Sequence, residues 1–99
     1  MKTDLRLLAN SLPRAWHSAR LGRIGDANLK VLRMEGPDDE QELHASDEAL
    51  LVLEGQLNLR LAGEVVAIAA GEVFIVPAGT PHSIAPGSSG TLVIVDRDD

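Results

Sequence analysis

The sequence predicts an all-β domain, built either as a two-sheet sandwich or as a closed barrel. Short apolar segments recur at regular spacing, and glycines separate most of them. One segment, residues 56–61, alternates strictly between polar residues and leucines. Because successive side chains of a strand point to opposite faces, this alternation indicates a half-buried strand with its leucines turned inward.

The first 27 residues have a mixed residue pattern, unlike the strand-like pattern of the rest. The chain therefore divides into an N-terminal segment (1–27) and a barrel (28–99). Leucines at helical spacing follow the cap candidates Thr3 and Asp4, which is consistent with one short helix. A strand fits equally well, because Pro13 ends the segment early. We expect this segment to pack on the barrel or on a partner chain.

The apolar segments of the barrel region predict a series of strands. They are expected over residues 28–34, 41–45, 48–54, 56–61, 64–69, 72–76 and 91–95. Glycine and proline mark turns between them, at 36–39 and 77–81 among others, and Gly79 is expected at positive φ. The run 50–53 is apolar on both strand faces, which indicates a covering layer or a partner chain on the outside.

Composition narrows the possible functions. The chain has 99 residues, 44% of them apolar, which suits one globular domain with an aliphatic core, since Trp16 and Phe74 are the only aromatic residues. A net charge of −6 without a basic run argues against nucleic acid and anionic membranes as partners. The absence of cysteine excludes disulfides and thiolate catalysis, and it fits a cytoplasmic protein. No apolar run is long enough for a membrane helix, and Asp4 interrupts any signal peptide.

Two motifs bring possible metal ligands into this strand pattern. In the first, Gly36 leads to Glu42-Leu43-His44, Glu48 follows after three residues, and Gly55 follows after six more. Glu42 and His44 share one face of the predicted strand 41–45, and Glu48 would begin the next strand on the same side.

In the second motif, Gly71 is followed by five residues, then by Pro77-Ala78-Gly79, and after two more residues by His82. With these paired motifs the chain resembles the small single-domain members of the cupin superfamily over about residues 28–96. The resemblance implies the RmlC-like jelly roll, a double-stranded β-helix barrel with its pocket in the interior, and an assembly as a homodimer.

The resemblance also implies a metal site at Glu42, His44, Glu48 and His82, in which Glu42 stands where most members have a histidine. A set of imidazoles and carboxylates suits a divalent ion such as Mn, Fe, Zn or Ni. Glu42 and Glu48 would be the catalytic residues, with Glu42 as a fourth ligand or a general base. No organic cofactor is expected.

The activity remains open at this stage. The resemblance admits a metal-dependent enzyme, of the isomerase, dioxygenase or decarboxylase kind, that acts on a small polar metabolite. It equally admits a non-catalytic ligand-binding or sensing module, and a metal-free cupin maintained for its interactions. The scarcity of aromatic residues favours an aliphatic or sugar-like small-molecule ligand.

Each candidate residue also has a plainer interpretation. His44 and His82 could be barrel histidines that bond each other or Glu48, and the two glutamates could be exposed charges. Trp16 is expected to be a packing anchor or a lid over one mouth of the barrel. Arg33 and Arg60 are expected on a solvated face rather than in an anion site.

Overall fold

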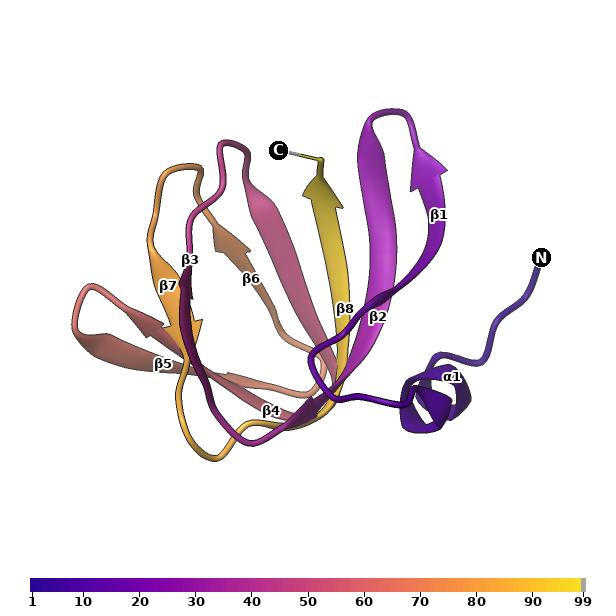
Figure 1. Cartoon of the computed structure of the whole chain (residues 1–99), viewed down its shortest axis with the longest axis horizontal. Helices are drawn as coiled ribbons and strands as arrows, with labels where there is room; N and C mark the ends of the chain where they lie inside the picture. The colour runs from indigo at the N-terminus through magenta and orange to yellow at the C-terminus, as the bar shows by residue number, and fades with distance from the viewer. Residues whose placement is uncertain (99) are drawn as a thin grey trace.

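The structure is a computed structural model that describes residues 1–98, and it confirms the predicted all-β class (Figure 1). One helix precedes a series of antiparallel strands. The elements are α1 Leu5–Ser11, β1 Ala19–Ile24, β2 Ala27–Glu35, β3 Asp38–Glu42, β4 Glu48–Leu61, β5 Glu64–Ala69, β6 Val73–Val76, β7 His82–Ile84 and β8 Ser89–Arg97. No helix in this described part of the chain has the length and apolar character needed to span a membrane.

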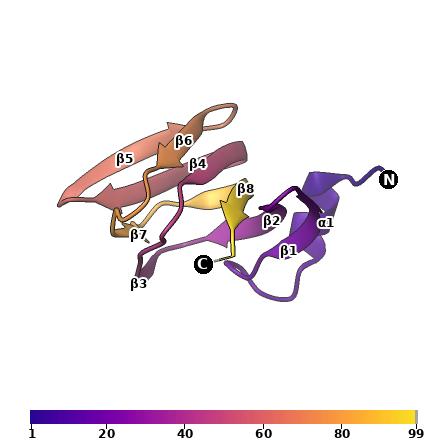
Figure 2. The ribbon, with the colours of Figure 1, turned by 90° about the horizontal axis from the view of Figure 1, so that it is seen from above.

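The strands form one strongly curled sheet. Its order is β1-β2-β8-β4-β7-β3, and β5 and β6 also pair with β4. The long strand β4 allows the curl, because its first part pairs with β6 and β8 while its second part pairs with β5 and β7. As a result β3 and β7 lie on one side of the molecule and β1 and β2 on the other, as Figures 1 and 2 show.

The inner face of the curled sheet carries an aliphatic core. The buried members are Leu32, Met34, Leu50, Val52, Leu57, Leu59, Ile68, Val76, Leu92 and Ile94. Trp16 and Phe74 pack against this core while remaining partly exposed. The predicted inward direction of the leucines in 56–61 is therefore confirmed for Leu57 and Leu59, which are fully buried.

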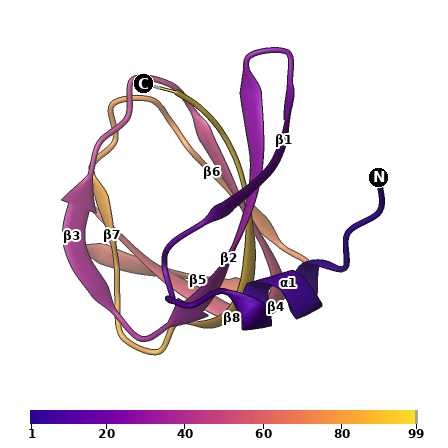
Figure 3. The ribbon, with the colours of Figure 1, turned by 45° about the vertical axis from the view of Figure 1, so that its right-hand side comes forward.

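The N-terminal segment contains a helix, which decides between the two interpretations of its leucines. Asp4 caps the helix by accepting a hydrogen bond from the Leu7 backbone N–H at 3.0 Å. At the other end the Arg33 guanidinium donates to the carbonyls of Ala9 and Leu12, at 3.1 and 2.7 Å. Arg33 is thus a helix-capping residue rather than a solvated one. Figure 3 shows α1 beside β2 and β8, the strands it contacts.

Several predicted boundaries were wrong. Residues 38–39 were expected in a turn, but strand β3 begins at Asp38 because it pairs there with Ile84 of β7 and again, at Glu42, with His82. Tertiary pairing thus outweighs the turn preference of Pro37 and the aspartates. Strand β4 also continues through Gly55, where a break was expected, and strands β1 and β7 were not predicted.

Candidate metal centre

The structure brings together the four residues expected at the metal site. Glu42 ends β3, His44 lies in the loop after it, Glu48 begins β4 and His82 begins β7. One ligand atom from each of these side chains lies within 4.8 Å of the corresponding atom of every other. Two imidazoles and two carboxylates therefore surround a common point.

The separations between these atoms are all longer than the roughly 2.7–2.9 Å typical of a charged hydrogen bond, although the contact of His44 with Glu42 still has hydrogen-bond geometry. The Nε2 atom of His82 lies 3.3 Å from a carboxylate oxygen of Glu48 and 3.6 Å from one of Glu42. The Nε2 atom of His44 lies 3.4 Å from Glu42 and 4.0 Å from Glu48. In contrast, the ammonium of Lys30 lies 2.8 Å from Asp96 elsewhere in the molecule.

His82 presents one particular ring nitrogen to the cluster. Its Nδ1 atom lies 3.0 Å from the backbone carbonyl of Thr80, which can only accept, so Nδ1 carries the proton and donates it. The Nε2 atom then faces Glu42 and Glu48. The residue is only 3% exposed, and within residues 1–98 this buried nitrogen has no aligned hydrogen-bond partner.

Electrostatic coupling within the cluster is strong. The carboxylates of Glu42 and, next, Glu48 raise the pKa of His82 to about 10, despite the opposing effect of burial. In return, His82 contributes most to holding the pKa of Glu42 below its usual value. Glu48 is 6% exposed, and a carboxyl so deeply buried is charged only where a cation lies beside it.

Two hydrogen bonds between loops hold the cluster in place. The Gly79 backbone N–H donates to the carbonyl of His44 at 2.8 Å. The Ala78 backbone N–H donates to the carboxylate of Asp47, also at 2.8 Å. Gly79 has a φ of 74°, as predicted, so the turn that precedes His82 is fastened to the loop that carries His44.

The prediction that His44 lies in a strand was wrong. We expected Glu42 and His44 on one face of a single strand, but β3 ends at Glu42 and His44 lies in the following loop. The imidazole reaches the cluster because this loop is tied to the turn around Gly79. The ring centroids of His44 and His82 are 5.6 Å apart, and the two rings are tilted by 47°.

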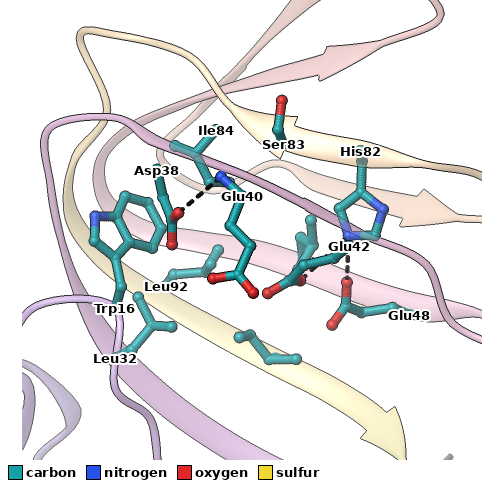
Figure 4. Close-up of a pocket in the computed structure, with 12 residues that line it drawn as sticks. Trp16, Leu32, Asp38, Glu40, Glu42, Glu48, His82, Ser83, Ile84 and Leu92 are labelled. Atoms are coloured by element: carbon teal, nitrogen blue, oxygen red, sulfur yellow. Dashed lines mark hydrogen bonds and ion pairs between the residues drawn. The ribbon is translucent and has the colours of Figure 1, made fainter.

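A cavity of about 70 Å³ opens beside the cluster (Figure 4). Its polar lining includes Glu42, Glu48 and His82, together with Asp38 and Glu40, which the sequence analysis missed as site residues. Their alternation along β3 is the signal that would have identified them, had the strand been predicted to begin at residue 38. The apolar lining consists of Trp16 and of Leu32, Leu50, Ile84, Leu92 and Ile94.

Trp16 lines the far end of this cavity and packs on the core, in agreement with its expected role as an anchor or lid. Its backbone N–H donates to the carbonyl of Arg33 at 2.9 Å, and its indole N–H donates to that of Glu35 at 3.2 Å. A φ of 66°, unusual for a residue with a side chain, accompanies these contacts. The ring is thus held in place from two directions.

Comparison with known proteins agrees with this geometry. The family model described as a cupin domain matches residues 29–96, which include all four residues of the cluster. The chain belongs to the cupin family. A search of curated protein sequences finds no match to this cupin.

Solved structures share the fold of this cupin at low sequence identity. A cupin-2 domain-containing protein from Shewanella frigidimarina is 21% identical, with a TM-score of 0.86 over 97% of this chain and 94% of that one. A cupin superfamily protein from Desulfitobacterium hafniense is 18% identical, with a TM-score of 0.76 over 100% and 94%. A Ralstonia eutropha protein that is provisionally assigned as a mannose-6-phosphate isomerase is 18% identical, with a TM-score of 0.72 over 90% of this chain and 89% of that one. These likenesses support the jelly-roll barrel.

Proposed function

We propose that Glu42, His44, Glu48 and His82 bind one divalent metal ion, and that this site binds or acts on a small polar metabolite. The orientation of His82 carries the proposal: a buried Nε2 atom without an aligned partner faces two carboxylates. Its other ring nitrogen donates to the Thr80 carbonyl, which is the outer contact that metal-binding histidines ordinarily make.

The spacing of the donors suits a shared ion better than direct pairing. Two ligands that each lie about 2.1 Å from an ion are roughly 3.0–3.4 Å apart. Three of the four imidazole-to-carboxylate separations lie between 3.3 and 3.6 Å. Two carboxylates would neutralise a divalent ion, and the mixed nitrogen and oxygen set suits Mn, Fe, Zn or Ni.

The enzyme hypothesis assigns separate tasks to the two glutamates. A bound ion would supply Lewis acidity or a site for dioxygen. Glu48, almost fully buried, would remain a ligand, whereas Glu42, whose side chain is 56% exposed, would be either the fourth ligand or, when it is not bound to the ion, the general base that takes a substrate proton. A binding module would use the same residues without proton transfer, so loss of turnover but not of binding in Glu42→Gln would support the enzyme.

We also propose that the protein is a cytoplasmic homodimer. The absence of cysteine supports the compartment. The outer faces of β4, β6 and β8 support the dimer, because they carry exposed apolar side chains that lie close together across the paired strands. These are Leu51, Val73, Ile75 and Val95.

Elemental analysis tests the metal proposal. Protein purified without a histidine tag is incubated with each candidate ion, desalted and analysed. We expect about one ion per chain, and a loss of it in the double variant His44→Ala, His82→Ala. His17→Ala is the matched control, because His17 is the third histidine of the chain and is exposed outside the cluster. Wild-type protein that takes up no ion from excess would overturn the proposal and leave a metal-free cupin.

A further inference from the structure

Strand β3 brings more carboxylates into the cavity than the proposed metal site uses. Asp38, Glu40 and Glu42 alternate along the strand, and all three line the cavity. Glu42 belongs to the metal cluster. Asp38 and Glu40 have no ion-pair partner within residues 1–98, although Asp38 accepts a hydrogen bond from the Glu40 backbone N–H at 3.1 Å.

Within residues 1–98 the cavity lining contains no lysine or arginine to balance these groups, and its one histidine, His82, is occupied by the ion in the loaded protein. The protein has 9 lysines and arginines, but none of them is among the residues that line the cavity. The lining includes four carboxylates, of Asp38, Glu40, Glu42 and Glu48. One divalent ion offsets only two of those charges, so the loaded site still repels phosphates and carboxylates and attracts cations.

The part of the cavity away from the metal cluster has the other features of a cation site. Trp16 and Asp38 lie at the end opposite His82, and Glu40 lies between (Figure 4). The face of an indole ring attracts a cation, and this ring is held by the hydrogen bonds of its backbone and indole N–H groups. Leu32 and Leu92 provide an apolar surface along the cavity for a short carbon chain.

Two further observations indicate that the cavity receives a ligand. The buried Nε2 atom of His82, in a side chain only 3% exposed, borders it without an aligned hydrogen-bond partner. The volume of about 70 Å³ holds several water-sized groups, which suits a molecule of few heavy atoms rather than a sugar phosphate.

We propose that the ligand is a small cationic amine, with its ammonium group between Asp38 and Glu40 beside Trp16 and its other end directed at the metal cluster. This inference rests on the proposed metal site and names the chemical class of its ligand. An ammonium group donates three hydrogen bonds and matches both the carboxylates and the ring face. The cavity therefore selects its ligand by positive charge.

The fluorescence of Trp16 reports binding directly, because it is the only tryptophan and the chain has no tyrosine. Protein loaded with one ion is titrated with three probes of similar size: 3-aminopropan-1-ol, propane-1,3-diol and 3-hydroxypropanoate. We expect the amine to bind at least about tenfold more tightly than the diol, the anion to bind most weakly, and added salt to weaken only the amine.

Variants on the two faces of β3 test whether Asp38 and Glu40 are the residues that bind the amine. Asp38→Asn with Glu40→Gln should reduce amine affinity to that of the diol and leave the metal content unchanged. Asp39→Asn is the matched control, since Asp39 carries the same charge on the same strand but does not line the cavity. Thermal unfolding of each variant shows whether it is folded.

The outcomes separate this inference from the metal proposal. Failure to take up any ion contradicts the metal site, whatever the probes do. Uptake of one ion, combined with equal or tighter binding of the diol or the anion, overturns the amine inference and leaves the metal site standing. Amine binding that survives the loss of Asp38 and Glu40 also overturns it.

Discussion

The Nδ1 atom of His82 lies 3.0 Å from the carbonyl oxygen of Thr80, and this contact determines which ring nitrogen faces Glu42 and Glu48. The same carboxylates raise the pKa of His82 to about 10. In the metal-free protein the imidazole therefore holds a second proton at neutral pH, and an ion that binds at Nε2 must displace it.

Metal affinity should therefore rise with pH. Between about pH 6 and about pH 9, each ion that binds releases one proton from His82, so the apparent association constant should increase about tenfold per pH unit. Titration in competition with a chelator measures the constant, and calorimetry in two buffers of different ionisation enthalpy counts the protons. His17→Ala should behave as wild type. An affinity that does not change with pH would show that the ion does not displace a proton from His82.

The stability of the metal-free protein should change with pH in the opposite direction. The unfolded chain releases the proton of His82 near pH 6.5, whereas the folded protein keeps it until about pH 10. The stabilisation is complete below pH 6.5 and is lost as the pH rises through this window. The free energy of unfolding should fall by at most about 1.4 kcal/mol per pH unit. Urea unfolding with a chelator present measures it, and His82→Gln should remove most of the slope.

The sequence identifies the cluster better than it identifies the strand that carries part of it. The spacing from Glu42 to Glu48 and the turn before His82 carry the resemblance to cupins, and that resemblance, rather than local backbone geometry, implied that the four residues lie together. The start of β3 was missed because its residues are acidic and follow Pro37, and only pairing with β7 makes them a strand. Asp38 and Glu40 were missed as cavity residues for the same reason.

Strand β1 was missed for a related reason. Residues 19–24 include Arg20 and Arg23 and show little apolar periodicity, and this strand lies at an edge of the sheet, next to β2. The helix-capping role of Arg33 has no sequence signal either, because it depends on the position of α1 against β2. Contacts between distant segments decide both features.

The proposed dimer predicts a change of mass when its apolar face is charged. Directly opposed residues of paired strands share a face, so Leu51 and Val73 are neighbours on the outside of the sheet. Val73→Lys with Ile75→Lys should convert the dimer to a monomer, as measured by sedimentation velocity. Val65→Lys is the matched control, because Val65 is 53% exposed on β5, away from this face. A monomeric wild-type protein would contradict the dimer.

The close approach of β4 and β8 predicts that Gly55 tolerates no side chain. A Cβ atom at Gly55 would lie 2.0 Å from the carbonyl oxygen of Ser89, and one at Gly90 would lie 1.9 Å from that of Glu54. Gly63 has the same φ of 82° as Gly55, but no atom of residues 1–98 lies within 4 Å of its Cβ position. Gly63→Ala should therefore lose only the cost of a left-handed backbone, about 1–2 kcal/mol.

Gly55→Ala bears that cost and must also separate the two strands, because the clashing atom is backbone rather than a flexible side chain. We expect a loss at least about 2 kcal/mol greater than for Gly63→Ala, of the size that overpacking causes. Urea unfolding of both variants, with the slope against denaturant checked for constancy, measures the difference. Equal losses would mean that β4 and β8 can move apart at this point without cost, and that their contact does not support the curl of the sheet.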